Sequence, residues 1–481
     1  MDKKKVAIVS CEMVPLMKVG GLADVTGSLY KKLNQYCDVS VFMPAFPQIK
    51  KILKTEKVSD FTVSFSPGRN EKVSFLKSMD PKYPALYLID NEIYFNRQEP
   101  YGKSGVDYPD NPERFSFFCK GVLEACRLNG LQFDVFHCHD WQTALLPLYL
   151  NEFYNDIHSK SVFTIHNLAY QGKFPKEKFS LLGLNWKYFN MEELEFYGSV
   201  NIMKAGIIHS EIITTVSPTY SKEILTSEYG CGLEGLLSKR KESLYGIING
   251  IDYQLWNPVF DPFITKKYKT RKAKIENKKA LQKKLNLSVD EKIPLLGFVG
   301  RLVQQKGTDL IVDAIKNIIG TETFQVVVLG TGEAKYETQL KEMALNYPGR
   351  ISITFQFNDH FARQIYAGSD FFLMPSRFEP CGLGQLISMK YGTIPIVRKT
   401  GGLADTVKDF NQDEKTGWGI VFEEPVSSGL QKSIQKAIDL YNHQESMDVL
   451  FNNARNRDFS WNQSIKQYWE IYQKAVNVLV K

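Results

Sequence analysis

Short apolar runs alternate with stretches of helical periodicity along the first half of the chain. The runs are rich in β-branched and aromatic residues and occur at residues 5 to 10, 38 to 44, 85 to 90, 134 to 140, 161 to 166 and 212 to 217. This alternation is typical of βαβ units, so it predicts a parallel sheet with crossover helices.

The same alternation starts again after a turn-rich and lysine-rich stretch near residues 250 to 290. Its apolar runs are at residues 293 to 301, 325 to 330, 351 to 357, 370 to 376 and 393 to 399. We therefore expect an α/β protein with two doubly wound, Rossmann-like domains, at residues 1 to 250 and 251 to 460. Apolar residues at helical spacing predict a terminal helix within residues 461 to 481.

Composition agrees with two folded domains. The chain has 481 residues, of which 43% are hydrophobic, so each half can bury a core of its own. No apolar stretch approaches the roughly 18 residues of a membrane span, which predicts a soluble protein without a membrane partner. The 7 cysteines are dispersed and form no C-x-x-C pair. They fit neither a disulfide framework nor a zinc site, and they favour the cytoplasm.

The positive charge is concentrated in one segment. Residues 266 to 284 hold ten Lys or Arg and one Glu, so the rest of the chain is close to neutral within the total of +7. Tyr268 is the single aromatic residue of the segment, and no helix-turn-helix signature is present. We interpret it as a solvated helix face and expect no nucleic-acid partner; a surface that attracts anions is the weaker alternative.

Two similar glycine loops occur, one in each half. KVGGLADV at residues 18 to 25 and KTGGLADTV at residues 399 to 407 both lead into a predicted helix. Glycines allow close approach to a ligand, and a helix start offers free N–H groups to an anion. We interpret both loops as anion-binding, with tight turns as the alternative. Ligands of open α/β sheets bind beyond the carboxyl ends of strands, so we expect a site in an inter-domain cleft.

Charged residues follow two predicted strands of the second half. Arg301 and Lys306 stand where the run 293 to 301 ends and a helix begins, an arrangement that suits a diphosphate. Glu379 follows the run 370 to 376 in the sequence PSRFEPCGLGQL, so we expect its carboxylate to face the same ligand.

Histidines mark strand ends in the first half. His137 and His139 share one face of a predicted strand, but no third ligand has typical metal spacing, so we reject a metal site. His166 ends another apolar strand, where a ligand role and a structural role are equally open. The chain has no G-x-S-x-G, H-E-x-x-H, Walker or G-x-G-x-x-G motif, which disfavours hydrolases, zincins, P-loop proteins and NAD enzymes.

Together these motifs resemble the bacterial glycogen synthase and plant starch synthase family. The matching segments, in the family's order, are KVGGLADV, HCHDWQTALLP, FTIHNLAYQG, VSPTYSKEI, INGIDYQLWNP, GRLVQQKG, PSRFEPCGLGQL and RKTGGLADTV. The resemblance implies the GT-B architecture, with the C-terminal helix returning to the first domain. It also implies glucose transfer from ADP-glucose to the non-reducing end of an α-1,4-glucan, with retention of configuration and without a metal or other cofactor.

The resemblance assigns roles to individual residues. It implies that Arg301 and Lys306 neutralise the departing diphosphate, that Glu379 holds the donor glucose, and that His166 lies against the transferring glucose. Further donor contacts are implied for Lys18, Gly20, Gly21, Asn249, Phe357, Cys381, Gly382, Leu383, Thr400 and Gly401. Acceptor or sugar contacts are implied for Asp24, Tyr94, Asp140 and Asn167.

Other interpretations stay open at this point. Another retaining GT-B transferase could use UDP-glucose or a different acceptor, because one aromatic residue such as Phe357 does not choose between adenine and uracil. A non-catalytic glucan-binding relative would be expected to lack Glu379 or the cation pair, and this chain has all three residues. An NAD-dependent dehydrogenase is disfavoured because the G-x-G-x-x-G motif is missing. A retaining hydrolase would need two carboxyl groups about 5 to 5.5 Å apart, whereas Glu379 is the single strong candidate.

Overall fold

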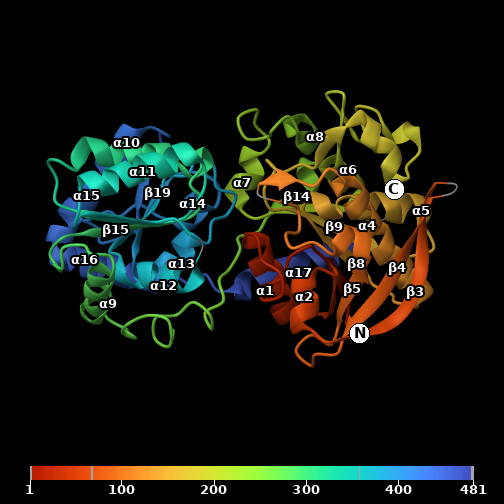
Figure 1. Cartoon of the computed structure of the whole chain (residues 1–481), viewed down its shortest axis with the longest axis horizontal. Helices are drawn as coiled ribbons and strands as arrows, with labels where there is room; N and C mark the ends of the chain where they lie inside the picture. The colour runs from red at the N-terminus through yellow and green to blue at the C-terminus, as the bar shows by residue number, and fades with distance from the viewer. Residues whose placement is uncertain (1–2, 67–68, 104, 357, 478–481) are drawn as a thin grey trace. The chain divides into compact units, whose positions relative to one another are not determined.

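The computed structural model describes residues 3–66, 69–103, 105–356 and 358–477. The chain divides into two compact units, each with its own sheet (Figure 1). Unit 1 comprises the described parts of Met1–Val216, Ser221–Ile247 and Trp461–Lys481, and unit 2 comprises those of Ser217–Tyr220 and Ile248–Ser460.

Unit 1 is built on a nine-stranded sheet in the order β14-β13-β9-β8-β1-β2-β5-β4-β3. Neighbouring strands from β14 to β5 are parallel, whereas β4 is antiparallel to both β5 and β3. The strands are β1 (Lys5–Val9), β2 (Asp38–Pro44), β3 (Thr55–Ser66), β4 (Arg69–Ser78), β5 (Leu86–Asp90), β8 (Val135–His139), β9 (Lys160–Ile165), β13 (Ile212–Thr215) and β14 (Leu244–Gly246). The expected parallel strands are therefore confirmed, and an antiparallel hairpin that the sequence analysis did not predict extends the sheet.

Unit 2 is built on a six-stranded sheet in which every neighbouring pair is parallel. The strand order is β17-β16-β15-β18-β19-β20. From β15 the chain first adds strands toward one edge and then, from β18, toward the other, as in a doubly wound fold. The strands are β15 (Leu295–Val299), β16 (Gln325–Leu329), β17 (Ile351–Thr354), β18 (Phe371–Met374), β19 (Ile394–Arg398) and β20 (Ile420–Phe422).

Helices connect the strands of both sheets. Those of unit 1 are α1 (Gly21–Leu33), α2 (Pro47–Ile52), α3 (Glu92–Phe95), α4 (Asn111–Leu128), α5 (Leu145–Phe153), α6 (Ile202–His209), α8 (Glu234–Lys239) and α17 (Trp461–Asn477), and α7 (Pro218–Glu223) spans the boundary between the units. Those of unit 2 are α9 (Arg271–Lys284), α10 (Thr308–Ile318), α11 (Ala334–Asn346), α12 (Asp359–Gly368), α13 (Gly384–Lys390), α14 (Gly401–Thr406), α15 (Ser427–Asn442) and α16 (Gln444–Arg455). Short strands pair as β10 (Lys173–Pro175), β12 (Ser199–Asn201) and β11 (Glu195–Phe196), and as β6 (Gly102–Lys103) and β7 (Val106–Asp107).

The last helix, α17, returns to unit 1, as expected. It packs against α1, β8 and β9, and Figure 1 shows it in blue beside the red α1. Trp461, Tyr468 and Tyr472 are buried on its inner face, and Trp469 stacks on Tyr36 with ring centroids 6.2 Å apart. Burial of these large rings attaches the end of the chain to the first sheet.

The lysine-rich helix α9 differs from the expected solvated face. Lys274 and Lys278 are buried, and the Lys274 ammonium donates to the backbone carbonyls of Tyr366 and Ala367. The Lys278 ammonium is paired with Asp370. One side of this helix therefore uses lysines as buried packing residues, because their long stems reach acceptors in the body of the unit.

Among the helices of the described ranges, none is long and apolar enough to cross a membrane.

Candidate active site

The first glycine loop precedes α1 in unit 1, where Gly20 is the N-cap residue. Lys18 is exposed on this loop, and its ammonium lies 3.1 Å from a carboxylate oxygen of Asp24 in the first turn of the helix. The Gly20 amide donates to the buried Glu12 carboxylate at 2.8 Å. The structure therefore brings Lys18 and Asp24 together, but the Gly20 amide already has a partner inside the protein.

Asp140 and His166 come together at the carboxyl ends of β8 and β9. The backbone N–H of His166 donates to Asp140 Oδ1 at 2.7 Å. Asp140 has a φ of 57°, in the left-handed region that non-glycine residues adopt at a cost, and such strain is concentrated at functional sites. Burial raises the pKa of the Asp140 carboxyl to about 7, so it can hold a proton near neutral pH.

Asn167 follows His166 in the next turn. Its side-chain oxygen accepts the N–H of Ala169 at 3.0 Å. Its own backbone N–H donates a hydrogen bond to the Asp140 carboxylate. The loop that carries His166 and Asn167 is thus held by a local hydrogen bond to Ala169 and by backbone hydrogen bonds to Asp140 on the neighbouring strand end.

Behind this loop, histidines form a buried network. His139 Nδ1 lies 3.0 Å from His166 Nε2. The rings of His137 and His139 are tilted against each other with centroids 4.1 Å apart, so they share one face of β8 as expected. His137 bonds to the Tyr472 hydroxyl of α17 at 2.8 Å and to Thr164 Oγ1 at 2.6 Å. This network ties the predicted catalytic loop to the terminal helix.

The buried histidines make the free energy of unfolding depend on pH. Burial lowers the pKa of His137 to about 3, and burial together with the His137 charge lowers the pKa of His139 far below its usual range. Burial also lowers the pKa of His166 to about 3. In the unfolded chain all three rings titrate near 6.5, so below that pH unfolding takes up three protons. Asp140 acts oppositely, because its raised pKa makes unfolding release one proton. The net uptake predicts that stability is full above about pH 6.5 and falls with acidification toward pH 3.

Urea titrations between pH 4.5 and 7.5 check this prediction. His137→Gln should flatten the pH dependence of the free energy of unfolding by roughly one proton, or about 1.4 kcal/mol per pH unit at the steepest point. His158→Gln, at an exposed position, should leave the slope unchanged. A stability that rises on acidification would contradict the buried neutral histidines.

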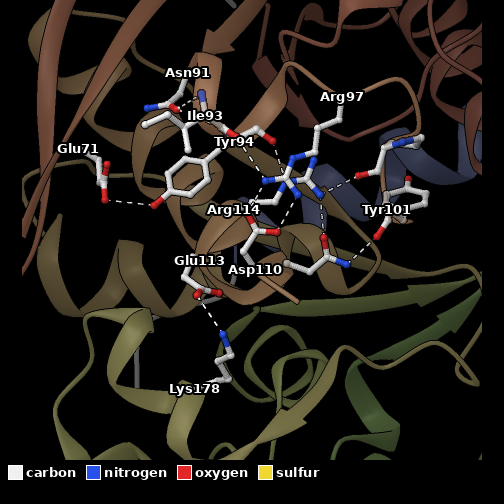
Figure 2. Close-up of polar contacts among 12 residues, drawn as sticks. Glu71, Asn91, Ile93, Tyr94, Arg97, Tyr101, Asp110, Glu113, Arg114 and Lys178 are labelled. Carbon is white, nitrogen blue, oxygen red and sulfur yellow. Dashed lines mark hydrogen bonds and ion pairs between the residues drawn. The ribbon is translucent and has the colours of Figure 1, made fainter. Parts of the chain in front are cut away.

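Tyr94, an expected acceptor contact, lies on α3 with its ring buried. Its hydroxyl donates to Glu71 Oε1 at 3.1 Å, and its backbone carbonyl accepts from Arg114 at 2.7 Å (Figure 2). Its ring packs against Phe117 with centroids 5.1 Å apart. The structure thus places Tyr94 in an aromatic cluster of unit 1, with its polar atoms bonded within the protein.

In unit 2, Glu379 and Lys306 form the central pair of the candidate site. Lys306 Nζ lies 2.6 Å from Glu379 Oε2, and the Ser376 hydroxyl donates to the same oxygen at 2.9 Å. Glu379 is buried, whereas the Lys306 side chain is 23% exposed. The strand ends of β15 and β18 therefore bring together two residues that are 73 positions apart in the sequence.

Arg301 lies directly beyond β15 and is exposed. Its guanidinium donates to the Gln305 side chain at 3.3 Å, while Gln305 also reaches the carbonyl of Phe378 at 3.4 Å. Arg301 and the segment that carries Glu379 are therefore linked through one glutamine, which sequence reasoning did not identify.

The second glycine loop abuts the Glu379 segment. Gly401 has a φ of 44°, and a Cβ at this position would collide with the carbonyl oxygen of Glu379. The next amide, Gly402 N–H, donates to that carbonyl at 3.1 Å, and Thr400 is the N-cap residue of the helix α14. Glycine is required here because the two loops approach backbone to backbone.

The remaining donor residues of unit 2 lie close to this junction. Gly382 has a φ of 75°, and Leu383 is the N-cap residue of α13. Burial raises the pKa of the Cys381 thiol to about 12, and Asn249 hydrogen-bonds to that thiol. The buried amide oxygen of Asn249 has no hydrogen-bond partner among the described residues. Phe357 lies outside the described residues.

Comparison with known proteins agrees with this architecture. A family model described as starch synthase catalytic domain matches residues 5–239, and one described as glycosyl transferases group 1 matches residues 277–457. The chain is 44% identical to a glycogen synthase of Thermodesulfovibrio yellowstonii, over 98% of each chain. It is 45% identical to a glycogen synthase of Fervidobacterium nodosum, over 98% of this chain and 99% of that one.

Solved structures give the same result. The catalytic domain of starch synthase IV from Arabidopsis thaliana, bound to ADP and acarbose, has a TM-score of 0.89 and 32% identity, covering 99% of this chain and 100% of that one. A sucrose-phosphate synthase from Thermosynechococcus elongatus, with 17% identity and a TM-score of 0.59 over 98% and 99% of the chains, shares the fold alone. Full-length identity above 40% to the bacterial relatives shows that this chain belongs to the glycogen synthase family of glycosyltransferases, which have the GT-B fold.

Proposed function

We propose that this protein transfers glucose from ADP-glucose to the non-reducing end of an α-1,4-glucan with retention of configuration. The observation that carries the proposal is the Lys306–Glu379 pair at 2.6 Å, at the strand ends of unit 2 and linked to Arg301. A cation beside a buried carboxylate suits a ligand with a diphosphate and sugar hydroxyls.

The residues have distinct roles in the proposed reaction. The bond between the anomeric carbon and the diphosphate breaks, so negative charge develops on the leaving phosphate, where Arg301 and Lys306 stabilise it. Glu379 accepts hydrogen bonds from the donor glucose, and the Asn249 amide oxygen accepts another. The acceptor hydroxyl forms the new bond on the face that the phosphate leaves, and its proton passes to the leaving phosphate oxygen.

The other predicted residues complete the binding of the two substrates. Backbone groups of Cys381, Gly382 and Leu383 hold the sugar and its phosphate, and Thr400 and Gly401 present the start of a helix to the diphosphate. In unit 1, Lys18 and Gly21 contribute to the donor, and Asp24, Tyr94, Asp140 and Asn167 to the sugar or acceptor. His166 lies against the transferring glucose, held by Asp140 and His139.

ADP-glucose is favoured over UDP-glucose because the similar Arabidopsis starch synthase was solved with ADP. We expect release of ADP from ADP-glucose that depends on added glycogen, with much slower release of UDP from UDP-glucose. Because Arg301 and Lys306 supply the positive charge, we expect EDTA to leave the rate unchanged. A coupled assay of nucleoside diphosphate release measures all three. Faster turnover of UDP-glucose than of ADP-glucose would leave the fold assignment unchanged and would show that UDP-glucose is the donor.

A further inference from the structure

Glu12 is a buried carboxylate that none of the predicted roles uses. It lies beyond the end of β1, and its residue is 4% exposed. An ionised carboxylate in such a place is costly unless hydrogen bonds replace its water. The hydrogen-bond partners of the Glu12 carboxylate therefore indicate its role.

The partners of Glu12 come from two segments. Oε2 accepts the backbone N–H groups of Val19 at 2.7 Å and Gly20 at 2.8 Å. Oε1 accepts the Tyr101 hydroxyl at 2.7 Å. All three donors are neutral, and two of them are the backbone amides immediately after Lys18.

Tyr101 is itself held by the beginning of α4. Its carbonyl accepts the Asn111 side chain at 2.8 Å, and the buried Arg114 guanidinium bonds to Asn111 Oδ1 at 2.7 Å and to the Pro100 carbonyl at 3.1 Å. Figure 2 shows Tyr101 and Arg114 in this cluster, with Arg97 paired to Asp110 beside them. The Tyr101 hydroxyl thus reaches Glu12 from a backbone that side chains of α4 hold by hydrogen bonds.

We propose that Glu12, supported by Tyr101, is a positioning residue that fixes the glycine loop and so places Lys18 for the donor. This inference rests on the proposed function of the loop. A carboxylate suits the task because one oxygen accepts two amides while the other accepts a hydroxyl. We call the hydrogen bonds of Glu12 to Val19, Gly20 and Tyr101 the clip. The clip leaves the Gly20 amide unavailable to the donor, so Lys18 and residues beyond Gly20 are the groups that contact the donor.

Three variants separate the parts of this clip. Glu12→Ala removes all three hydrogen bonds and should raise the KM for ADP-glucose at least about tenfold, while the KM for glycogen changes little. Glu12→Gln keeps an oxygen for the two amides and should recover most of the donor affinity. Tyr101→Phe removes one hydrogen bond and should have a smaller effect in the same direction.

Amide hydrogen exchange of the ligand-free protein supplies a readout that needs no substrate. Peptides that contain residues 18 to 21 should exchange faster in Glu12→Ala, with exchange in β8 and β9 unchanged. The matched control is Glu152→Ala, because Glu152 also accepts a tyrosine hydroxyl, that of Tyr188, at 2.5 Å. This control should change neither exchange in the loop nor the KM for ADP-glucose.

Different results would refute the role of Glu12 and the proposed function of the protein. Unchanged exchange of residues 18 to 21 in Glu12→Ala overturns the clip, and so does faster exchange with an unchanged KM for ADP-glucose. Wild-type protein that does not turn over ADP-glucose refutes the proposed function instead; faster exchange in Glu12→Ala then still supports the clip, and unchanged exchange overturns it.

Discussion

Replacing Glu379 with Gln should lower kcat for glucosyl transfer by about 10²- to 10³-fold, while the protein stays folded. The neutral amide can still bond to Ser376, but it removes the negative charge that lies 2.6 Å from Lys306. Donor glucose then loses a charged acceptor, and Lys306 loses the partner that orients it. Initial rates of ADP release with saturating ADP-glucose and glycogen measure the effect, and circular dichroism checks folding.

Glu445→Gln is the matched control for this variant. Glu445 pairs with Lys415 at the same distance of 2.6 Å, but its side chain is 79% exposed. An exposed pair contributes little, so activity and stability should stay at the wild-type level. A Glu379→Gln protein with wild-type kcat would show that this carboxylate is not part of the catalytic machinery.

Lys278→Ala should destabilise the folded protein by about 3 to 5 kcal/mol, although the residue lies in a lysine-rich segment. Lys278 is 1% exposed, and its ammonium lies 2.7 Å from Asp370 and 2.6 Å from the Tyr441 hydroxyl. The alanine variant leaves Asp370, whose side chain is 14% exposed, without this cation, and it opens a cavity under α9.

The free energy of unfolding in urea measures this loss. Lys283→Ala, on the exposed side of the same helix, should change stability by less than about 0.5 kcal/mol. Equal stability of the two variants would mean that Lys278 is solvated after all, in agreement with the sequence-based interpretation of the segment.

The fold was predictable where one physical signal was dominant. The run 370 to 376 is apolar on both faces, which is the pattern of a buried parallel strand, and it formed β18. The hairpin of β3 and β4 was missed, although Phe61, Val63 and Phe65 alternate with polar residues along β3. Strict alternation is the signal of a half-buried strand, so this strand was predictable from the sequence.

The sequence proposes candidate site residues one by one, but it does not predict which of them pair. Sequence motifs singled out Glu379 and Lys306, whereas their ion pair depends on which strands of the sheet are neighbours. The same limit applies to Lys278, because composition alone does not show which side of a charged helix is buried. Glu12 follows a predicted strand, and that position could have drawn attention to it.

Incorporation of labelled glucose tests the central proposal most directly. The protein is incubated with ADP-[¹⁴C]glucose and glycogen, and the purified polymer is digested with β-amylase, which removes maltose from non-reducing ends joined by α-1,4 bonds. We expect the label to be released as maltose, and we expect no incorporation with Glu379→Gln. Label that stays in the limit dextrin, or that appears as free glucose before digestion, would contradict retaining transfer to the non-reducing end.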